Sequence, residues 1–216
     1  MKRNESMIKI LIADDHAIVR RGLKQILEET PNIVVADEAS TGKEVLEKIS
    51  EKEYDVVVLD ISLPDKSGLD ILKQLKSQKP KLPVLVLSIY PEEQYAERVL
   101  KIGASGYLTK ESAPEELITA IKKVSVGGKY ITASLAEKLA FNLDEKTDKL
   151  LYETLSDREF QVMCSISSGK TQKEIAAELS LSIKTISTYR YRILEKMRMK
   201  SNAELTRYAI ENKLVN

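Results

Sequence analysis

Residues 56–68 read VVVLDISLPDKSG, and this stretch decides the fold that the sequence predicts. Four apolar residues lead directly into Asp60, and Pro64 and Gly68 then turn the chain. A short apolar run that ends in turn residues is typical of a strand buried on both faces of a parallel sheet. The charge at the end of this strand needs an explanation, because a buried carboxylate without a partner is costly.

Similar short runs rich in Val, Ile and Leu recur along the first half of the chain. Helical patterns lie between them, and in the first of these four apolar residues share one stripe: Val19, Leu23, Ile26 and Leu27. Five strands alternating with five helices predict an α/β fold, a doubly wound five-stranded parallel sheet. The predicted strands are residues 8–15, 32–38, 54–60, 82–88 and 105–110.

The alternation stops after the fifth helix. Gly127 and Gly128 break the pattern and a charged stretch follows, so residues 127–150 are predicted to be a linker with one helix near 133–141. Residues 151–216 are predicted to form an all-α four-helix domain, in which LSLS joins two short helices in the manner of a helix-turn-helix. A hydroxyl side chain opens each of these helices: Ser156, Thr171, Ser182 and Ser201.

Composition limits the class of protein. A chain of 216 residues with 43% hydrophobic residues favours two modest domains. No apolar run approaches the roughly 20 residues of a membrane span, so we expect a soluble, cytoplasmic protein that does not engage a membrane. The single cysteine, Cys164, excludes an internal disulfide and argues against a cysteine zinc site.

The net charge of +1 hides an asymmetry. Residues 151–216 carry 11 Lys and Arg against 8 Asp and Glu, whereas residues 1–150 carry 23 against 25. Within the tail, residues 184–200 hold six basic residues against Glu195 alone. This segment is therefore a candidate surface for a polyanion.

The charge at the end of the third strand is explained by what collects beside it. All strands of a parallel doubly wound sheet end at one edge, where ligands bind. That edge receives Asp14, Asp15, Asp60, Ser88 and Lys110. Carboxylates about 4 Å apart repel by roughly 4 kcal/mol per pair at an effective dielectric near 20, so three together need a cation.

All-oxygen ligands at an open, hydrated edge favour Mg²⁺. A single Asp at a strand end could instead cap the next helix. That alternative fails for the set, because Asp14, Asp15 and Asp60 come from separate segments and Lys110 matches an incoming anion. A metal-bound carboxylate beside a hydroxyl and an ammonium suits acceptance of a phosphoryl group, with Asp60 as the nucleophile.

Residues 7–126 resemble the receiver domain of bacterial two-component response regulators. The residues that carry the resemblance have the order and spacing found in receivers: the acidic pair Asp14 and Asp15, then Asp60, Pro64, Gly68, Ser88 and Lys110. The resemblance implies that Asp60 accepts a phosphoryl group from a sensor histidine kinase. It also implies that Asp15, Asp60 and the carbonyl of Ser62 hold the metal, with Asp14 acting largely through water.

The resemblance further implies a switch. Phosphorylated Asp60 would draw the Ser88 hydroxyl towards a phosphoryl oxygen, and Tyr107 would pack into the space that this leaves. The alternative for Tyr107 is an ordinary half-buried strand tyrosine. His16, the only histidine, is expected to be a neighbour of the site and not a ligand.

In the second domain, a helical wheel of residues 183–197 predicts which side chains face outward. One stripe should pack inward: Ile186, Tyr189, Ile193 and Met197. The outward side suggests base contacts by Ser187, Thr188 and Tyr191, since early residues of a recognition helix reach base edges. Phosphate contacts are predicted for Lys184, Arg190, Arg192 and Lys200. A solvated charged face is the alternative for an isolated basic helix.

Residues 151–216 resemble the LuxR-type helix-turn-helix, so the whole chain resembles the NarL/FixJ class. The motifs are LSDREFQVM, GKTQKEIAAELSLSIKTISTYRYRILEKM and SNAEL. Tyr189 and Ser187 depart from the His and Lys that many members carry, so no relative's sequence preference can be carried over. The resemblance implies a transcription regulator that binds double-stranded DNA as a homodimer through residues 202–212. It leaves open the phosphorylated receiver as a second dimer interface and RNA polymerase as a partner.

Two other classes are weighed against this one. A haloacid-dehalogenase-like phosphatase would need a second Asp two residues after Asp60, where the chain has Ser62. A signalling protein whose helical tail binds protein or RNA is the other alternative. The sequence lacks the GxxxxGK[ST] and GxGxxG loops of nucleotide-binding enzymes, so we expect a regulator and not an enzyme.

Overall fold

The structure, a computed structural model, describes residues 7–133, 135–137 and 150–215. The chain divides into two compact units between Ala136 and Glu137. Across these described ranges, no helix has the length and apolar character that crossing a membrane requires.

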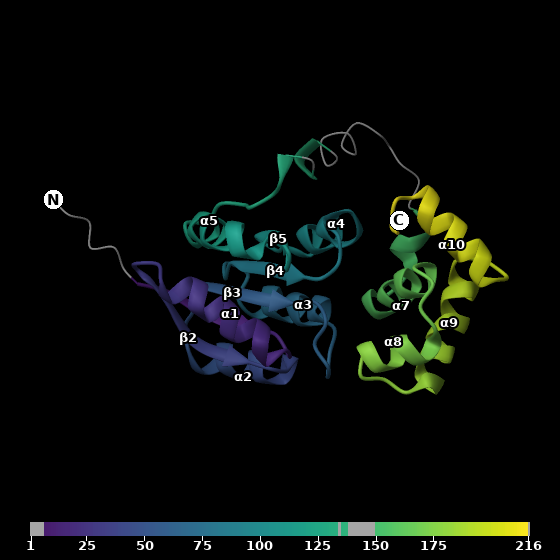
Figure 1. The fold of residues 1–216 in the computed structure, drawn as a ribbon, viewed down its shortest axis with the longest axis horizontal. Coiled ribbons are helices and arrows are strands. Elements are labelled where there is room, and N and C mark those ends of the chain that lie inside the picture. Colours follow the sequence, from purple (N-terminus) through teal and green to yellow (C-terminus); the bar gives the residue numbers. More distant parts are fainter. Residues whose placement is uncertain (1–6, 134, 138–149, 216) are drawn as a thin grey trace. The chain divides into compact units, whose positions relative to one another are not determined.

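The first unit contains a five-stranded parallel sheet, as the strand–helix alternation predicts (Figure 1). The strand order, which the sequence analysis did not predict, is β2-β1-β3-β4-β5. Every residue of β3 and β4 is buried, which explains their uninterrupted apolar sequences. The first strand ends at Ala13, so Asp14 and Asp15 follow it and do not belong to it. The strands are β1 (Ile8–Ala13), β2 (Ile33–Ala39), β3 (Val56–Asp60), β4 (Val84–Ser88) and β5 (Gly106–Thr109).

Five helices cover the two faces of the sheet. Helices α1 and α5 contact each other on one face, and α2, α3 and α4 contact in succession on the other. Leu23 and Leu27 of α1 are buried, and Val19 and Ile26 pack against the same core, which confirms the predicted stripe. The helices are α1 (Ala17–Glu28), α2 (Gly42–Glu51), α3 (Gly68–Gln78), α4 (Glu92–Ile102) and α5 (Ala113–Ser125).

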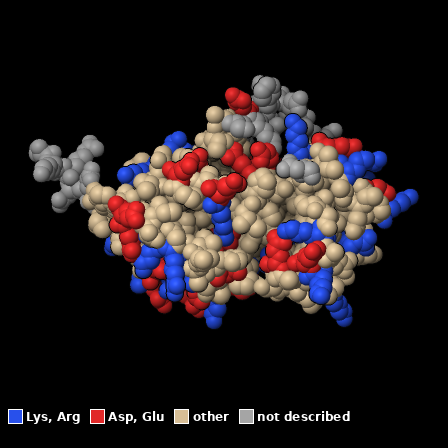
Figure 2. All heavy atoms as spheres, in the orientation of Figure 1, with Lys and Arg blue, Asp and Glu red and all other residues tan. Residues whose placement is uncertain are grey.

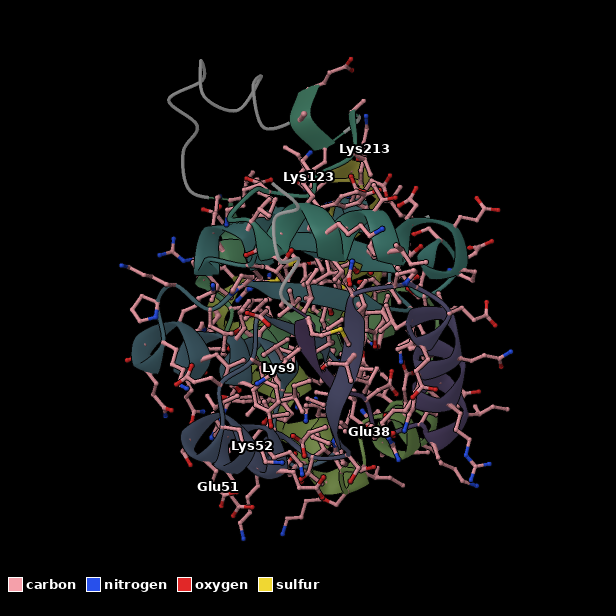
Figure 3. The ribbon with its side chains drawn as sticks, turned by 90° about the vertical axis from the view of Figure 1, so that its left-hand side faces the viewer. Lys9, Glu38, Glu51, Lys52, Lys123 and Lys213 are labelled. Carbon is pink, nitrogen blue, oxygen red and sulfur yellow. The ribbon has the colours of Figure 1, made fainter. Side chains whose placement is uncertain are left out.

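The strand order places the carboxyl ends of β1 and β3 at a special position. The chain leaves β1 towards β2 on one side and later returns to β3 on the other, so the connections diverge between these two strands. Ligand sites of doubly wound sheets form at such a switch point. The strand starts lie at the opposite edge, where Figure 3 shows Lys9 with helices on both sides of the sheet.

The loop after β3 is held by close backbone packing. A Cβ added at Gly68 would lie 2.2 Å from the carbonyl oxygen of Asp60, so only glycine lets α3 begin here. The Gly68 N–H donates to the Ile61 carbonyl at 2.8 Å. Asp65, further along the loop, accepts the first N–H groups of α2 from Gly42 at 2.7 Å and Lys43 at 2.9 Å. These contacts hold the loop that follows Asp60 in place.

The first unit extends past the predicted boundary at residue 126. The Tyr130 N–H donates to the Ser105 carbonyl at 2.8 Å, and Tyr130 forms a parallel bridge with Gly106 on the edge strand β5. A Cβ on Gly106 would lie 2.7 Å from the Tyr130 carbonyl oxygen, so glycine is required for this approach. Of the predicted linker, residues 134 and 138–149 lie outside the described residues, as does much of the helix expected near 133–141.

The second unit is helical, as predicted. A short 3₁₀ turn, η1 (Leu151–Thr154), precedes four helices. Ser156 with Glu159 and Thr171 with Glu174 form capping boxes, and Ser182 and Ser201 cap the other two helices. These helices are α7 (Asp157–Ser167), α8 (Gln172–Glu178), α9 (Ile183–Lys196) and α10 (Asn202–Glu211).

One ion pair fastens α9 to the beginning of α7. Lys196 Nζ lies 2.6 Å from Glu159 Oε2, and the same oxygen accepts the Ser156 N–H at 2.8 Å. The Glu159 side chain is almost completely buried. Burial alone would raise the pKa of Glu159, but the Lys196 salt bridge and the Ser156 hydrogen bonds together lower it below its ordinary value.

Candidate phosphoacceptor site and nucleic-acid interface

The structure brings the predicted acidic residues and Lys110 together at the carboxyl edge of the sheet. Lys110 Nζ lies 2.8 Å from Asp60 Oδ2 and 2.6 Å from Asp14 Oδ2. Asp60 is 2% exposed and Asp14 is 1% exposed. Two buried carboxylates therefore share one ammonium group, which leaves the site with excess negative charge.

The backbone orients both carboxylates. The Ser62 N–H donates to Asp60 Oδ1 at 3.1 Å, and the His16 N–H donates to Asp14 Oδ1 at 2.8 Å. Lys110 is itself placed by the sheet, because its N–H donates to the Ser88 carbonyl at 2.7 Å. Each group is thus held by an element that the sequence pattern predicts.

A metal ion fits the acidic group. Ligand atoms of Asp14, Asp15, His16 and Asp60 lie within 4.8 Å of one another. Asp15 Oδ1 is a buried oxygen that accepts no hydrogen bond, although His16 Nδ1 lies 2.7 Å away. Carboxylate oxygens near a partly exposed edge suit a hard divalent cation that retains water. The predicted acidic cluster therefore exists, with His16 beside it.

Burial and charge shift the pKa values in this site. Burial raises the pKa of Asp60; Lys110 opposes that shift and the Asp14 carboxylate reinforces it. Burial alone would lower the pKa of Lys110, but the Asp60 and Asp14 carboxylates raise it above its ordinary value. A bound cation would favour ionised Asp60, since opposite charge stabilises the carboxylate.

Ser88 and Tyr107 meet at one backbone position, Tyr90. The Ser88 hydroxyl oxygen accepts the Tyr90 N–H at 3.1 Å, and the Tyr107 hydroxyl donates to the Tyr90 carbonyl at 2.7 Å. Tyr107 is 1% exposed, so it is buried and not half-buried, and its role as a switch residue stays a prediction. Burial raises the pKa of Tyr107, and the Ser88 hydroxyl opposes that shift through a hydrogen bond.

Sequence reasoning missed two residues around this site. Tyr90 lies in the β4–α4 connection, where no periodicity marks a contact with another strand. Arg20 of α1 donates through Nη1 to the Asp14 carbonyl at 2.7 Å and through Nε to Glu38 Oε2 at 3.2 Å. A basic residue on a helix has many surface roles, so the sequence alone gave no signal for this one.

In the second unit, α9 presents the predicted face. Ile186, Ile193 and Met197 are buried and Tyr189 is half-buried, which confirms the inward stripe. Tyr191 is 67% exposed. The other exposed residues of the predicted face are Lys184, Ser187, Thr188, Arg192 and Lys200. Ile183, at the start of α9, is an exposed apolar residue to which sequence reasoning gave no role.

Two residues of this face contact neighbouring helices. Ser187 Oγ donates to Gln172 Oε1 of α8 at 2.8 Å, and Arg190 Nε donates to Asn202 Oδ1 of α10 at 2.7 Å. Arg190 is only half-buried, so its guanidinium keeps further donors for another ligand. Over the face in view, Figure 2 shows basic and acidic side chains interspersed, so the basic character of α9 and the turn after it is a local feature.

With this geometry established, comparison with known proteins gives the family. The model of the response regulator receiver domain matches residues 10–122, and that of the bacterial regulatory proteins of the luxR family matches residues 153–209. The chain therefore belongs to the two-component response regulators that join a receiver to a LuxR-type DNA-binding domain. It is a transcriptional response regulator of the NarL/FixJ class.

Particular relatives are similar over nearly their whole length. The chain is 36% identical to the response regulator UvrY of Escherichia coli K12, covering 97% of both chains. It is 34% identical to the response regulator GacA of Pseudomonas aeruginosa, covering 97% of this chain and 99% of GacA. RcsB from Salmonella enterica serovar Typhimurium, solved on promoter DNA with the phosphomimetic BeF₃⁻, has a TM-score of 0.59 at 26% identity, covering 94% and 98% of the two chains.

Proposed function

We propose that Asp60 accepts a phosphoryl group from a sensor histidine kinase and that this controls binding of double-stranded DNA through α9. The observation that carries the proposal is the grouping of two buried carboxylates with Lys110 at the carboxyl edge of the sheet. This arrangement combines a nucleophile with a cation that can meet a phosphoryl oxygen.

The transfer conserves atoms and charge. An Asp60 carboxylate oxygen forms a bond to phosphorus while the bond from phosphorus to the donor's leaving group breaks. The leaving group is an imidazole for a phosphohistidine donor and acetate for acetyl phosphate. Lys110, now beside Asp60 Oδ2, would pair with an oxygen of the transferred phosphoryl group. Water attack on the acyl phosphate later returns Asp60, so the chain acts as a regulator and not as an enzyme with its own substrate.

Mg²⁺ fits the acidic group and would be held by Asp14, Asp15, Asp60 and the Ser62 carbonyl. It supplies positive charge that offsets repulsion between the carboxylates and an incoming phosphoryl group. The residues of the chain do the rest: Lys110 orients the phosphoryl group, and the Ser62 N–H holds one carboxylate oxygen of Asp60.

We infer that the structural change after phosphorylation takes place in the connection between β4 and α4. Ser88 would turn its hydroxyl towards a phosphoryl oxygen and give up the Tyr90 N–H that it now accepts. The Tyr107 hydroxyl bonds the carbonyl of the same residue, so a change at Ser88 reaches Tyr107 through Tyr90. A phosphoryl group need only shift a two-state equilibrium by a few kcal/mol to act as a switch.

On DNA, Ser187, Thr188 and Tyr191 would contact base edges. Phosphate contacts are assigned to Lys184, Arg190, Arg192 and Lys200, in keeping with their exposed or half-buried positions. One helix contacts few base pairs, so a homodimer on paired half-sites is expected, through α10. RcsB, a relative solved on promoter DNA, supports this reading. RNA polymerase stays open as a further partner, and double-stranded DNA as the ligand is in keeping with a cytoplasmic location.

The domain boundaries proposed from the sequence are a receiver at 7–126, a linker at 127–150 and a DNA-binding domain at 151–216. The Tyr130–Ser105 contact favours moving the start of the linker beyond Ala136.

The proposal is tested by Asp60→Asn in the full chain. Wild-type protein with acetyl phosphate and Mg²⁺ should incorporate close to one phosphoryl group and bind a selected duplex at least about tenfold more tightly, equivalent to about 1.4 kcal/mol. The Asn variant should incorporate none and should show no gain in affinity. Intact mass and a duplex titration measure the two quantities.

Asp70→Asn is the matched control, because Asp70 is an exposed carboxylate in the first turn of α3. It should behave as wild type. If Asp60→Asn kept the phosphorylation and the gain in affinity, the proposal would be wrong. Repeated turnover of a phosphate ester without DNA preference would instead favour a phosphatase.

A further inference from the structure

A hydrogen bond joins α8 to the predicted base-reading face of α9. Ser187 is exposed on that face, and its hydroxyl donates to Gln172 Oε1 at 2.8 Å. Gln172 is the first residue of α8, where the capping box of Thr171 and Glu174 fixes the backbone. The contact therefore comes from an ordered helix start and not from a loop.

This bond decides what Ser187 can offer to DNA. A serine hydroxyl has one proton to donate and lone pairs that accept. Because Gln172 takes the proton, Ser187 presents only an acceptor. In the major groove the amino groups of adenine N6 and cytosine N4 are donors, whereas guanine N7 and O6 and thymine O4 are acceptors. A Ser187 held in this way matches adenine or cytosine.

Thr188, the neighbouring residue, provides an internal comparison. Its hydroxyl donates to the Lys184 carbonyl at 3.0 Å, within α9 itself. The orientation of Thr188 therefore depends on α9 alone, whereas that of Ser187 depends on α8 as well. A change at Gln172 should affect the two positions differently.

We propose that Gln172 is a specificity-determining positioning residue, which holds the Ser187 hydroxyl so that Ser187 reads an adenine or cytosine amino group in the major groove. The inference rests on the proposed function of α9 as the DNA-reading helix. Within the described part of the chain the amide nitrogen of Gln172 donates no hydrogen bond, so it stays available to a nearby phosphate oxygen. Without Gln172 the hydroxyl is released from this orientation and can also donate to a base, so discrimination at that base pair falls.

The test is selection from a randomised duplex library by the full chain, treated with acetyl phosphate and Mg²⁺. Wild type is compared with Gln172→Ala, Ser187→Ala and the double variant. Gln172→Ala and Ser187→Ala should relax the same base pair of each half-site, with discrimination there falling about 5- to 20-fold, in the range of one hydrogen bond. The double variant should lose no more than either single variant. Thr188→Ala should relax a different base pair.

Two further variants separate positioning from simple binding. Gln172→Glu keeps an acceptor for the Ser187 hydroxyl, so the preference should remain while the added negative charge weakens binding to every duplex. Lys173→Ala, on the next residue of α8, should leave the preference unchanged. Circular dichroism and thermal unfolding of each variant establish that α8 and α9 are intact.

The inference is overturned if folded Gln172→Ala keeps the wild-type preference, or if it relaxes a position that Ser187→Ala leaves intact. A uniform loss of affinity with the preference unchanged also overturns it, since Gln172 would then only contact phosphate. If wild type itself enriches no sequence, the proposed function fails and this inference fails with it.

Discussion

The two units place their candidate functional residues in opposite environments. In the first unit Asp14, Asp60 and Tyr107 are almost completely buried, and Lys110 joins the two carboxylates. In the second unit the candidate contact residues Ser187, Thr188 and Tyr191 are exposed on α9. Phosphoryl transfer needs charges held in place away from water, whereas reading a groove needs side chains that stand clear of the protein.

The difference in burial also determines how strongly each candidate site is coupled to the stability of its unit. A buried charged site is coupled to the stability of the fold, because removing one partner leaves another charge without compensation. An exposed face is coupled to stability only weakly, because surface substitutions usually change it by about 0.5 kcal/mol or less. Mutations in the first site should therefore change folding and function together, while mutations on α9 should change function alone.

The largest effect is expected for Lys110→Met, which leaves Asp14 and Asp60 facing each other without the ammonium group. The free energy of unfolding of the first unit should fall by about 3 to 5 kcal/mol at neutral pH. Added Mg²⁺ should recover part of this loss by supplying positive charge. Calorimetry of the full chain, following the transition of the first unit, measures the change.

Lys101→Met is the matched control, because the exposed Lys101 pairs at 3.0 Å with the half-buried Glu97 of its own helix α4. Its effect should stay below about 1 kcal/mol. If Lys110→Met were as stable as this control, Lys110 would not contribute to the stability of the first unit. The buried site would then be no more strongly coupled to folding than the exposed face of α9.

A smaller effect is expected for Glu159→Gln, which removes a buried charge from the second unit. Glu159 accepts from both Lys196 and the Ser156 backbone, so local stability should fall by about 1 to 3 kcal/mol at pH 7. The folded-state pKa of Glu159 is lowered, so its stabilising contribution is complete above the unfolded value near 4.3. That contribution is lost as the pH falls through the lower, folded-state pKa.

Hydrogen exchange of the α7 and α9 amides in the full chain, from pH 3 to 7, measures the difference in local stability between wild type and Glu159→Gln. Wild type and variant should converge towards the acid end of the range. A difference that stayed constant with pH would mean that packing, and not the charge of Glu159, holds the two helices together.

The smallest change in stability is expected for Lys184→Ala on the exposed face of α9. Unfolding should change by about 0.5 kcal/mol or less. Loss of one phosphate contact should weaken binding to all duplexes alike and reduce the slope of log affinity against log salt by about one. Fluorescence anisotropy at several salt concentrations measures the slope. Lys122→Ala, which removes an exposed lysine of α5, should leave the slope unchanged. An equal effect of this variant would show that the phosphate contact is not specific to α9.

Periodicity in the sequence predicted the elements and their order. Val56 to Leu59 are buried on both faces of the sheet, and an uninterrupted apolar run is the direct trace of such burial. The capping boxes of α7 and α8 could be predicted for a similar reason, since each is a local pattern of hydroxyl and carboxylate. The grouping of Asp14, Asp60 and Lys110 followed from the rule that parallel strands end at one edge.

Other features could not be predicted because they join residues that no local pattern relates. Tyr130 pairs with Ser105 across the edge of the sheet, which moves the end of the first unit beyond residue 126. Arg190 was predicted to contact phosphate, and the structure shows that it also donates to Asn202 of α10, which no local pattern indicated. Such contacts depend on how the helices and strands pack against one another.

The sequence by itself determined the strands, the helices, their order and the residue types gathered at the carboxyl edge, because burial and capping leave a trace within a few residues. Tertiary structure alone decided that Lys110 is shared by Asp14 and Asp60, that Tyr90 lies between Ser88 and Tyr107, and that Gln172 holds Ser187. The physical reason is the distance along the chain over which each feature acts. Periodicity within a few residues shows which side of an element is buried. A hydrogen bond between two elements depends on how those elements pack together.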